Sequence, residues 1–132
     1  MSAEENKRVV QSLFEAFGRG DIPGVLGLVS EDARWDAPGP AAVPFYGERR
    51  GHEGATEFFQ QLGSNVDFEV FEVKELIAEG DSVVVTGRER GRVKSSGKTY
   101  EQDWVLLFKV RGGKVTHFHC YDNTSAVAEA FS

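Results

Sequence analysis

The sequence predicts an α+β fold, with helices gathered on one face of an antiparallel sheet. Apolar residues recur at helical spacing through much of the first half of the chain, whereas from about residue 65 they alternate with polar residues as in β-strands. Turn sequences at 79–81, 95–98 and 111–114 divide the second half into segments of similar length. Helices followed by hairpin-connected strands pack as two layers.

Two helices are predicted before any strand. Ser2 and Glu5 form a capping-box sequence in front of a helix over residues 3–18. Asp21 can cap a second, short helix, which tolerates Pro23 because the first amides of a helix have no intrahelical partner. Local sequence therefore specifies where both helices begin.

The middle of the chain predicts a short strand, a loop and a third helix. Residues 33–37 predict the strand, and Pro38 ends it. A loop with three prolines follows over 38–50, and loops of this length are often functional. Residues 51–63 carry an apolar stripe at helical spacing and end in glycine, which predicts a helix.

Residues 65–123 predict four antiparallel strands joined by hairpins. The alternation changes parity near residue 70, which predicts a bulge that bends the first of these strands. Residues 123–131 could add a short closing helix. A bent strand curves the sheet, and a curved sheet covered by helices leaves a conical hollow in which a small molecule can sit.

Length, composition and charge narrow the functional classes. The 132 residues suffice for one domain and one core, and no apolar run approaches the ~20 residues of a membrane span. The chain has 15 basic and 21 acidic residues, a net charge of −6, which argues against nucleic acid as a partner. Because the first residues do not resemble a secretory signal and the single cysteine cannot form an internal disulfide, we expect a cytoplasmic protein.

The aromatic composition favours an apolar cavity. Ten phenylalanines accompany three tyrosines and two tryptophans, a set that suits dry packing or an apolar pocket. Trp35, Trp104 and Tyr46 are candidate ligand contacts, and Phe14, Phe17 and Phe58 are candidate walls. The alternative is that all six belong to the core.

Four stretches resemble the nuclear transport factor 2-like superfamily, and within it the SnoaL-like polyketide cyclases and ketosteroid isomerase-like proteins. They are FEAFGRGDIPGVLGLVSEDARWDAPGP, FYGERRGHEGATEFFQQL, AEGDSVVVTGRERGRVKSSGK and WVLLFKVRGGKVTHFHCYDNTSAV. The resemblance implies a cone-shaped fold, with three helices from the N-terminal half on the concave face of the sheet, and a single SnoaL-like domain over residues 1–132. It also implies a homodimer formed through the outer face of the sheet. The superfamily hosts isomerases, cyclases, dehydratases, epoxide hydrolases and non-catalytic domains.

The chain departs from the catalytic patterns of these relatives. The general base of ketosteroid isomerase falls on Ala37, its oxyanion-hole tyrosine near Leu13 and its companion acid near Trp104. Steroid-type isomerisation by those groups is therefore not expected.

Two other patterns are also incomplete. Limonene epoxide hydrolase needs an arginine between two aspartates; Arg88 matches the arginine, but the aspartates fall on Arg90 and Asn123. The acid/base of SnoaL-like cyclases also falls on Asn123, and Asp122 lies one step away, turned to the opposite face of the strand.

The last strand supplies the candidate catalytic residues. Side chains on a strand alternate faces, so His117, His119, Tyr121 and Asn123 share one face, and the resemblance implies that it lines the cavity. His119 is the candidate base, because histidine titrates near neutrality at a pKa of about 6.5, and Tyr121 is the candidate hydrogen-bond donor. Arg88 or Asn123 would stabilise developing negative charge, and His117 would contact the substrate. The alternative for His119 is a pocket histidine whose hydrogen bonds are satisfied within the protein.

The same two histidines are also candidate ligands of a metal ion. On a strand their Cα atoms lie ~6.5 Å apart, so zinc or iron could bridge the rings if a carboxylate joined. Asp36, Glu89 and Asp103 are possible third ligands, but no spacing selects one. The resemblance implies no metal, so neither a metal site nor a cofactor is predicted.

Two functions therefore stay open. The first is a protein that binds a small, largely apolar oxygenated molecule in the conical pocket and transfers a proton on it, as an isomerase, cyclase, dehydratase or hydrolase would. The second is a non-catalytic ligand-binding or dimerisation domain, which the missing carboxylates favour. Neither requires nucleic acid or a membrane as a partner.

Overall fold

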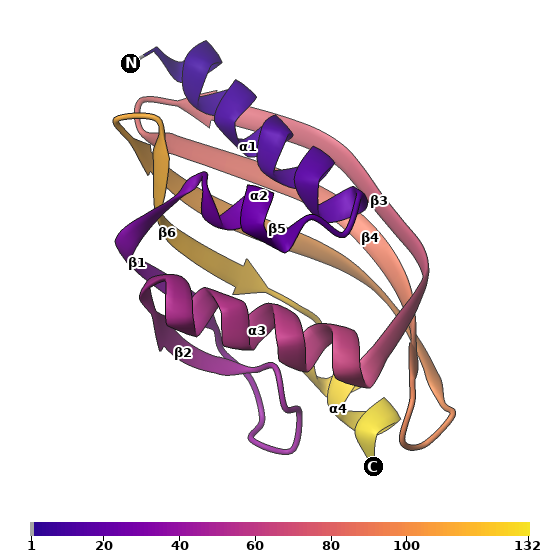
Figure 1. The fold of residues 1–132 in the computed structure, drawn as a ribbon. Coiled ribbons are helices and arrows are strands. Elements are labelled where there is room, and N and C mark those ends of the chain that lie inside the picture. The colour runs from indigo at the N-terminus through magenta and orange to yellow at the C-terminus, as the bar shows by residue number, and fades with distance from the viewer. Residues whose placement is uncertain (1) are drawn as a thin grey trace.

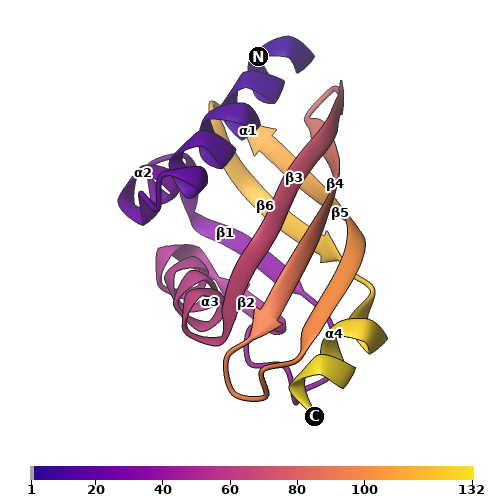
Figure 2. The same ribbon diagram turned by 90° about the vertical axis from the view of Figure 1, so that its right-hand side faces the viewer.

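The computed structural model describes residues 2–132 and has an α+β fold with one six-stranded sheet. Helices α1, α2 and α3 cover one face of the sheet, and α4 lies near its end beside the β4–β5 hairpin (Figures 1 and 2). The predicted fold class is confirmed. The elements are α1 Ala3–Gly18, α2 Ile22–Leu26, β1 Val29–Ala37, β2 Gly47–Arg50, α3 Gly51–Asn65, β3 Val66–Glu79, β4 Ser82–Val93, β5 Thr99–Arg111, β6 Lys114–Tyr121 and α4 Thr124–Phe131.

The predicted helix caps form. The Ser2 side chain accepts a hydrogen bond from the Glu5 amide at 3.1 Å, and the Glu5 side chain accepts one from the Ser2 amide at 3.3 Å. Asp21 accepts from the Gly24 amide at 2.9 Å at the start of α2. Such bonds satisfy amides that have no intrahelical partner, which is why short local sequences locate helix starts well.

The sheet is mixed, in the order β2-β1-β6-β5-β4-β3, whereas the sequence predicted antiparallel pairing. β1 pairs parallel with β6, and it begins at Val29 rather than at residue 33. β2 lies in the predicted loop, where its four residues are too few and too polar to show an alternating pattern. The parallel partner of β1 lies about 80 residues away in the chain, a pairing that local pattern cannot reveal.

The predicted bulge is confirmed, and a second one accompanies it. The register of β3 against β4 shifts between Phe68 and Val70 and again between Val73 and Glu75. Bulges bend a strand and increase its twist, and the long β3–β4 hairpin bends beyond the end of α1 (Figure 1). This curvature encloses the space between sheet and helices.

The two faces of the sheet differ in burial. The inner face carries the core, including Trp35 and Phe108 at 1% exposure each. The outer face leaves Val105 39% and Tyr121 53% exposed. Apolar exposure there agrees with the expected dimer interface, which stays a prediction. Among residues 2–132, no helix is both long and apolar enough to cross a bilayer.

Candidate functional site

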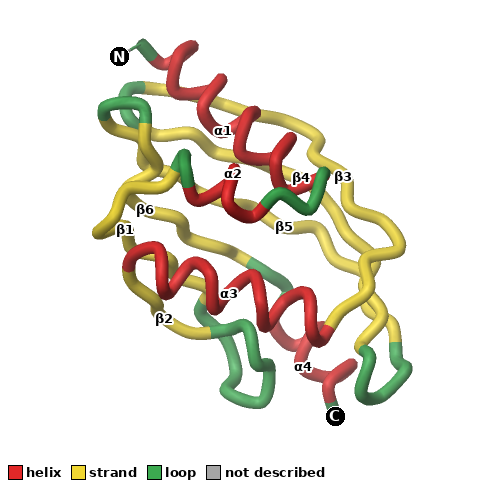
Figure 3. The backbone as a smooth tube through the Cα atoms, in the orientation of Figure 1, coloured by secondary structure: helices red, strands yellow, loops and turns green. Residues whose placement is uncertain are grey.

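A cavity of about 80 Å³ lies between the helices and the inner face of the sheet. Aromatic rings from helices α1 and α3 and from strands β1, β3, β5 and β6 form most of its wall. Residues 38–46, the long loop between β1 and β2 in Figure 3, contribute Phe45 and Tyr46 to this wall. The wall consists of Leu13, Phe14, Phe17, Trp35, Ala37, Phe45, Tyr46, Phe58, Phe59, Leu62, Phe68, Phe71, Glu89, Trp104, Leu106, Phe108, Phe118, Cys120 and Asp122.

Both tryptophans of the wall hold an unpaired N–H. The Trp35 ring stacks on Phe118 with centroids 4.4 Å apart, and the Trp104 ring stacks on Phe71 at 5.3 Å. Neither indole Nε1 has a hydrogen-bond partner within residues 2–132, although both atoms are buried. A buried donor without a partner costs about 1–3 kcal/mol, so a ligand or water oxygen that accepts from it is favoured.

Two carboxyl groups face this apolar space, each held by a phenol. Tyr100 donates to Glu89 Oε2 at 2.6 Å, and Tyr46 donates to Asp122 Oδ2 at 2.8 Å. The Cys120 thiol donates to the other oxygen of Asp122 at 3.1 Å. These bonds fix both carboxyl groups on the cavity wall.

The surroundings of Glu89 raise its pKa from 4.5 to about 7. Burial is the main cause, the negative charge of Asp122 adds to it, and hydrogen bonds from Tyr100 and Gln102 oppose it. Burial also raises the pKa of Tyr46 and of Tyr100, and the neighbouring carboxylates raise both further. Both phenols therefore remain hydrogen-bond donors at neutral pH.

Glycines on β4 make room for the aromatic rings of the site. Gly87 lies opposite Trp104 and Gly91 opposite Tyr100 in the β4–β5 pair. A Cβ on Gly91 would come within 2.6 Å of the Tyr100 hydroxyl, and one on Gly87 would overlap the Trp104 ring. Gly87, Glu89 and Gly91 alternate along β4. The Glu89 carboxyl group therefore lies between the Trp104 ring, which packs over Gly87, and the Tyr100 ring, which packs over Gly91.

Six of the predicted ligand contacts do line the cavity. They are Trp35, Trp104, Phe14, Phe17, Tyr46 and Phe58. Their contact with a ligand stays a prediction. The prediction of an apolar pocket from the aromatic composition agrees with this wall.

The predicted placement of the last-strand residues is wrong. Phe118 and Cys120 face the cavity, whereas His117, His119 and Tyr121 lie on the outer face of the sheet. On β6 the even-numbered side chains oppose Leu106 and Phe108 of β5, which belong to the core. Because strand faces alternate, an alignment displaced by one residue turns every side chain to the wrong side. The roles proposed for His119 as base and Tyr121 as donor lose their geometric basis.

Arg88 and Asn123 are also outside the cavity. Arg88 points to the outer face, where its Nε lies 3.9 Å from Glu72 Oε1 in a solvent-exposed pair. Asn123 is exposed and caps α4, since its side chain accepts from the Ala126 amide at 3.4 Å. Caps of this kind stabilise helix starts, so a structural role accounts for Asn123.

The sequence indicated Glu89 only as a possible metal ligand, gave no indication of Tyr100, and placed Asp122 on the wrong face. A signal for Glu89 was present: Val83 and Val85 precede it, and Val93 follows it, at the same strand parity. If the same face of the strand stays buried through the charged segment, Glu89 points to the inner face of the sheet. The arginines on both sides concealed this, because they indicate a solvated strand.

Cys120 is expected to resist alkylation in the folded protein. Its side chain is buried, and burial together with the adjacent Asp122 raises the pKa of the thiol well above its usual value. Thiolate is the reactive form, so iodoacetamide at pH 8 should react roughly 100-fold more slowly than with free cysteine. Mass spectrometry of native and urea-unfolded protein measures the two rates. Equal rates would contradict the buried position.

Comparison with known proteins agrees with this fold. The SnoaL-like domain family matches residues 10–118. An NTF2-like protein from Burkholderia xenovorans LB400 is 39% identical over 100% of this chain and 99% of its own, with a TM-score of 0.92. An NTF2-like protein of unknown function from Burkholderia pseudomallei K96243 is 25% identical over 100% of this chain and 99% of its own, with a TM-score of 0.88.

Further solved structures share the fold. TerC, in a structure co-crystallised with polyporic acid, is 26% identical over 96% of this chain and 98% of its own, with a TM-score of 0.85. Structures named as isomerases and as a SnoaL-like polyketide cyclase have this fold too, at 18–21% identity to this chain. No curated protein matches this chain. On the matched domain and the shared fold, the chain belongs to the SnoaL-like family and has the NTF2-like fold.

Proposed function

We propose that this protein binds a small, largely apolar, oxygenated molecule in the cavity and transfers a proton on it, with Glu89 as the group that takes up and returns the proton. Asp122 is the neighbouring carboxylate whose charge helps to raise the pKa of Glu89. The observation that carries the proposal is Glu89, a buried carboxyl group in an apolar wall, whose pKa is raised to about 7. At that value both protonation states are populated at neutral pH. The group can therefore accept a proton from a ligand and return it.

The chemistry suits a carbonyl compound with an acidic C–H bond. Glu89 would take the proton from carbon, and the negative charge would move to the carbonyl oxygen. Trp35 Nε1 or Trp104 Nε1, the unpaired donors, would stabilise that oxygen by hydrogen bonding. Return of the proton to a different carbon completes an isomerisation. Attack of the carbanion on a second carbonyl carbon of the ligand forms the ring bond and breaks the C=O π bond, and the resulting alkoxide takes the proton from Glu89, which completes a cyclisation.

The size of the cavity limits the ligand. Drug-sized ligands occupy about 300–1,000 Å³, and a cavity of about 150 Å³ holds one benzene ring. At about 80 Å³ this cavity must widen before a ring can bind. Residues 38–46 are the segment that would open, because Phe45 and Tyr46 of this loop form part of the wall.

A non-catalytic binding module is the second candidate. Both oxygens of Asp122 already accept hydrogen bonds, from Tyr46 and Cys120, and Tyr100 binds Glu89. Such a network is also what a purely structural pair of buried carboxyl groups would need. Ligand binding without turnover would favour this candidate.

The test combines ligand binding with turnover. Carboxyl ¹³C NMR follows Glu89 from pH 4 to 9, with and without apolar ketones, lactones, epoxides and polyporic acid. We expect Glu89 to titrate near pH 7 and to respond to at least one compound. Turnover of that compound should fall about 100-fold or more in Glu89→Gln and in Asp122→Asn, whereas His119→Gln, on the outer face, should retain it.

Three results would count against the proposal. Binding without turnover would leave the binding module as the function. Loss of turnover in His119→Gln, with Glu89→Gln active, would restore the histidine as base. Titration of Glu89 near 4.5 with no response to any compound would remove the basis of both candidates.

A further inference from the structure

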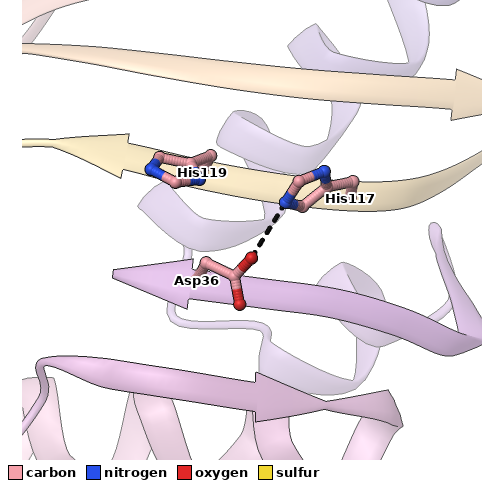
Figure 4. A group of neighbouring side chains, drawn as sticks. All are labelled: Asp36, His117 and His119. Carbon is pink, nitrogen blue, oxygen red and sulfur yellow. Dashed lines mark hydrogen bonds and ion pairs between the residues drawn. The ribbon is translucent and has the colours of Figure 1, made fainter. Parts of the chain in front are cut away.

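We propose a second site, on the outer face of the sheet, in which Asp36, His117 and His119 bind a divalent transition-metal ion such as Zn²⁺. The ligating atoms of the three side chains all lie within 4.8 Å of one another. His117 Nε2 is 3.0 Å from Asp36 Oδ2, and the two side chains point toward each other (Figure 4). The sequence left three carboxylates open as a third ligand, and the fold brings Asp36 to the histidines.

The parallel pairing of β1 with β6 creates this cluster. Asp36 lies opposite His119, and Arg34 lies opposite His117. His117 and His119 are two residues apart on one strand, so they share a face. All three side chains therefore project from paired strands in the sheet, a rigid support that suits a metal site better than a loop does.

The separations fit the coordination of zinc. Ligand atoms about 2.0–2.1 Å from Zn²⁺ lie roughly 3–3.4 Å apart at the angles of octahedral and tetrahedral sites. The distance of 3.0 Å between His117 Nε2 and Asp36 Oδ2 already falls in this range. The ligating nitrogen of His119 lies within 4.8 Å of the other two ligand atoms, and its ring stacks on Tyr121 with centroids 4.5 Å apart. Metal binding would draw this ring closer to Asp36 and His117.

The ligand types also fit. Two imidazoles and one carboxylate are the donor set of open zinc sites and of non-haem iron sites, which leave further positions for water or substrate. The side chain of Asp36 is only 5% exposed, whereas that of His117 is 25% exposed. In the single chain, a buried carboxylate beside partly exposed imidazoles gives a metal ion access from solvent.

Neighbouring charges compete with a cation here. Arg34 Nη2 lies 3.0 Å from Asp36 Oδ2, but the Arg34 side chain is 52% exposed and can swing into water. Lys109 lies opposite His117 on β5, and Glu48 lies opposite Asp36 on β2. Arg50 lies opposite Arg34 on β2 and adds a further positive charge. Arg34, which already pairs with Asp36, is the group that binding must displace.

This site is separate from the cavity. β1 and β6 present Trp35, Phe118 and Cys120 to the cavity, and Asp36, His117 and His119 to the outer face. The sheet itself lies between the two sets. The metal proposal therefore does not rest on the proposed function, and either can fail without the other.

Calorimetric titration of the chelator-treated full chain with ZnCl₂ tests the site. We expect one Zn²⁺ per chain, and an affinity more than about tenfold weaker in His119→Gln and in His117→Gln, because each removes a direct ligand. Arg34→Gln should strengthen binding by up to about fivefold, since it removes the competing charge. Histidine ring NMR should show His117 and His119 shifting together on addition of Zn²⁺.

Two variants serve as matched controls. His52→Gln changes the remaining histidine, whose Nε2 lies 2.6 Å from the Val29 carbonyl oxygen, and Cys120→Ser removes the thiol. Both should bind Zn²⁺ as the unmodified protein does. Circular dichroism confirms that each variant is folded. Failure to bind Zn²⁺, unchanged affinity in His119→Gln, or loss of binding in either control would overturn the site.

Discussion

Glu89→Gln is expected to raise the free energy of unfolding by about 3 kcal/mol at pH 8 and to change it little at pH 4. The folded protein holds the proton of Glu89 up to about pH 7, whereas the unfolded chain releases it near 4.5. Between these values the native state binds more protons, so the stability of the unmodified protein falls as the pH rises. Glutamine keeps an oxygen for Tyr100 and carries no charge, so it avoids this loss.

Urea unfolding of both proteins at pH 4, 6 and 8 measures the difference. Glu79→Gln is a suitable control, because Glu79 is an exposed residue at the end of β3. The free energy of unfolding of this control should not exceed that of the unmodified protein by an amount that grows with pH. A constant difference between Glu89→Gln and the unmodified protein across this range would mean that Glu89 ionises normally, and would remove the main support for an acid/base site.

Gly87→Ala is expected to lower the free energy of unfolding by about 2–3 kcal/mol and to disturb the cavity. A Cβ at this position would overlap both the Glu72 carbonyl oxygen and the Trp104 ring. The carbonyl belongs to the paired strand β3, next to its second bulge, so the backbone has little freedom to retreat. The Trp104 ring must therefore move toward the cavity that it lines.

Tryptophan fluorescence during urea unfolding reports both effects. Gly63→Ala is the matched control, because a Cβ at Gly63 meets no atom within 4 Å and the residue lies in α3. Alanine favours helix over glycine, so this change should stabilise the protein by up to about 1 kcal/mol. Equal stability of Gly87→Ala and the unmodified protein would show that the strands separate more readily than their packing indicates.

The two faces of β1 and β6 carry different chemistry. On the inside, a cavity of mainly aromatic residues holds Asp122 beside Cys120 and Tyr46. On the outside, Asp36 meets two histidines. Because side chains on a strand alternate between its two faces, consecutive residues supply both sets. The orientation of the strand in the sheet therefore decides which set faces the cavity.

Local physical chemistry made part of the structure predictable. The Ser2 capping box, the Asp21 cap and the bulge near residue 70 depend on hydrogen bonds or patterns within a few residues, and all three form. The aromatic wall was predictable too, because ten phenylalanines in a curved α+β fold must pack against one another. These features determined the fold class.

The identity of the site depended on tertiary structure. The sequence of β6 has polar and apolar residues on both parities, so only its pairing with Leu106 and Phe108 of β5 decides that Cys120 faces the cavity. The parallel pairing of β1 with β6 brings Asp36 to the histidines across about 80 residues of chain. The raised pKa of Glu89 arises mainly from burial, which depends on residues that are distant in the sequence. The sequence by itself located the helices and the long strands but not β2. The packing of distant strands decided which side chains share a face, because that depends on contacts between residues far apart in the chain.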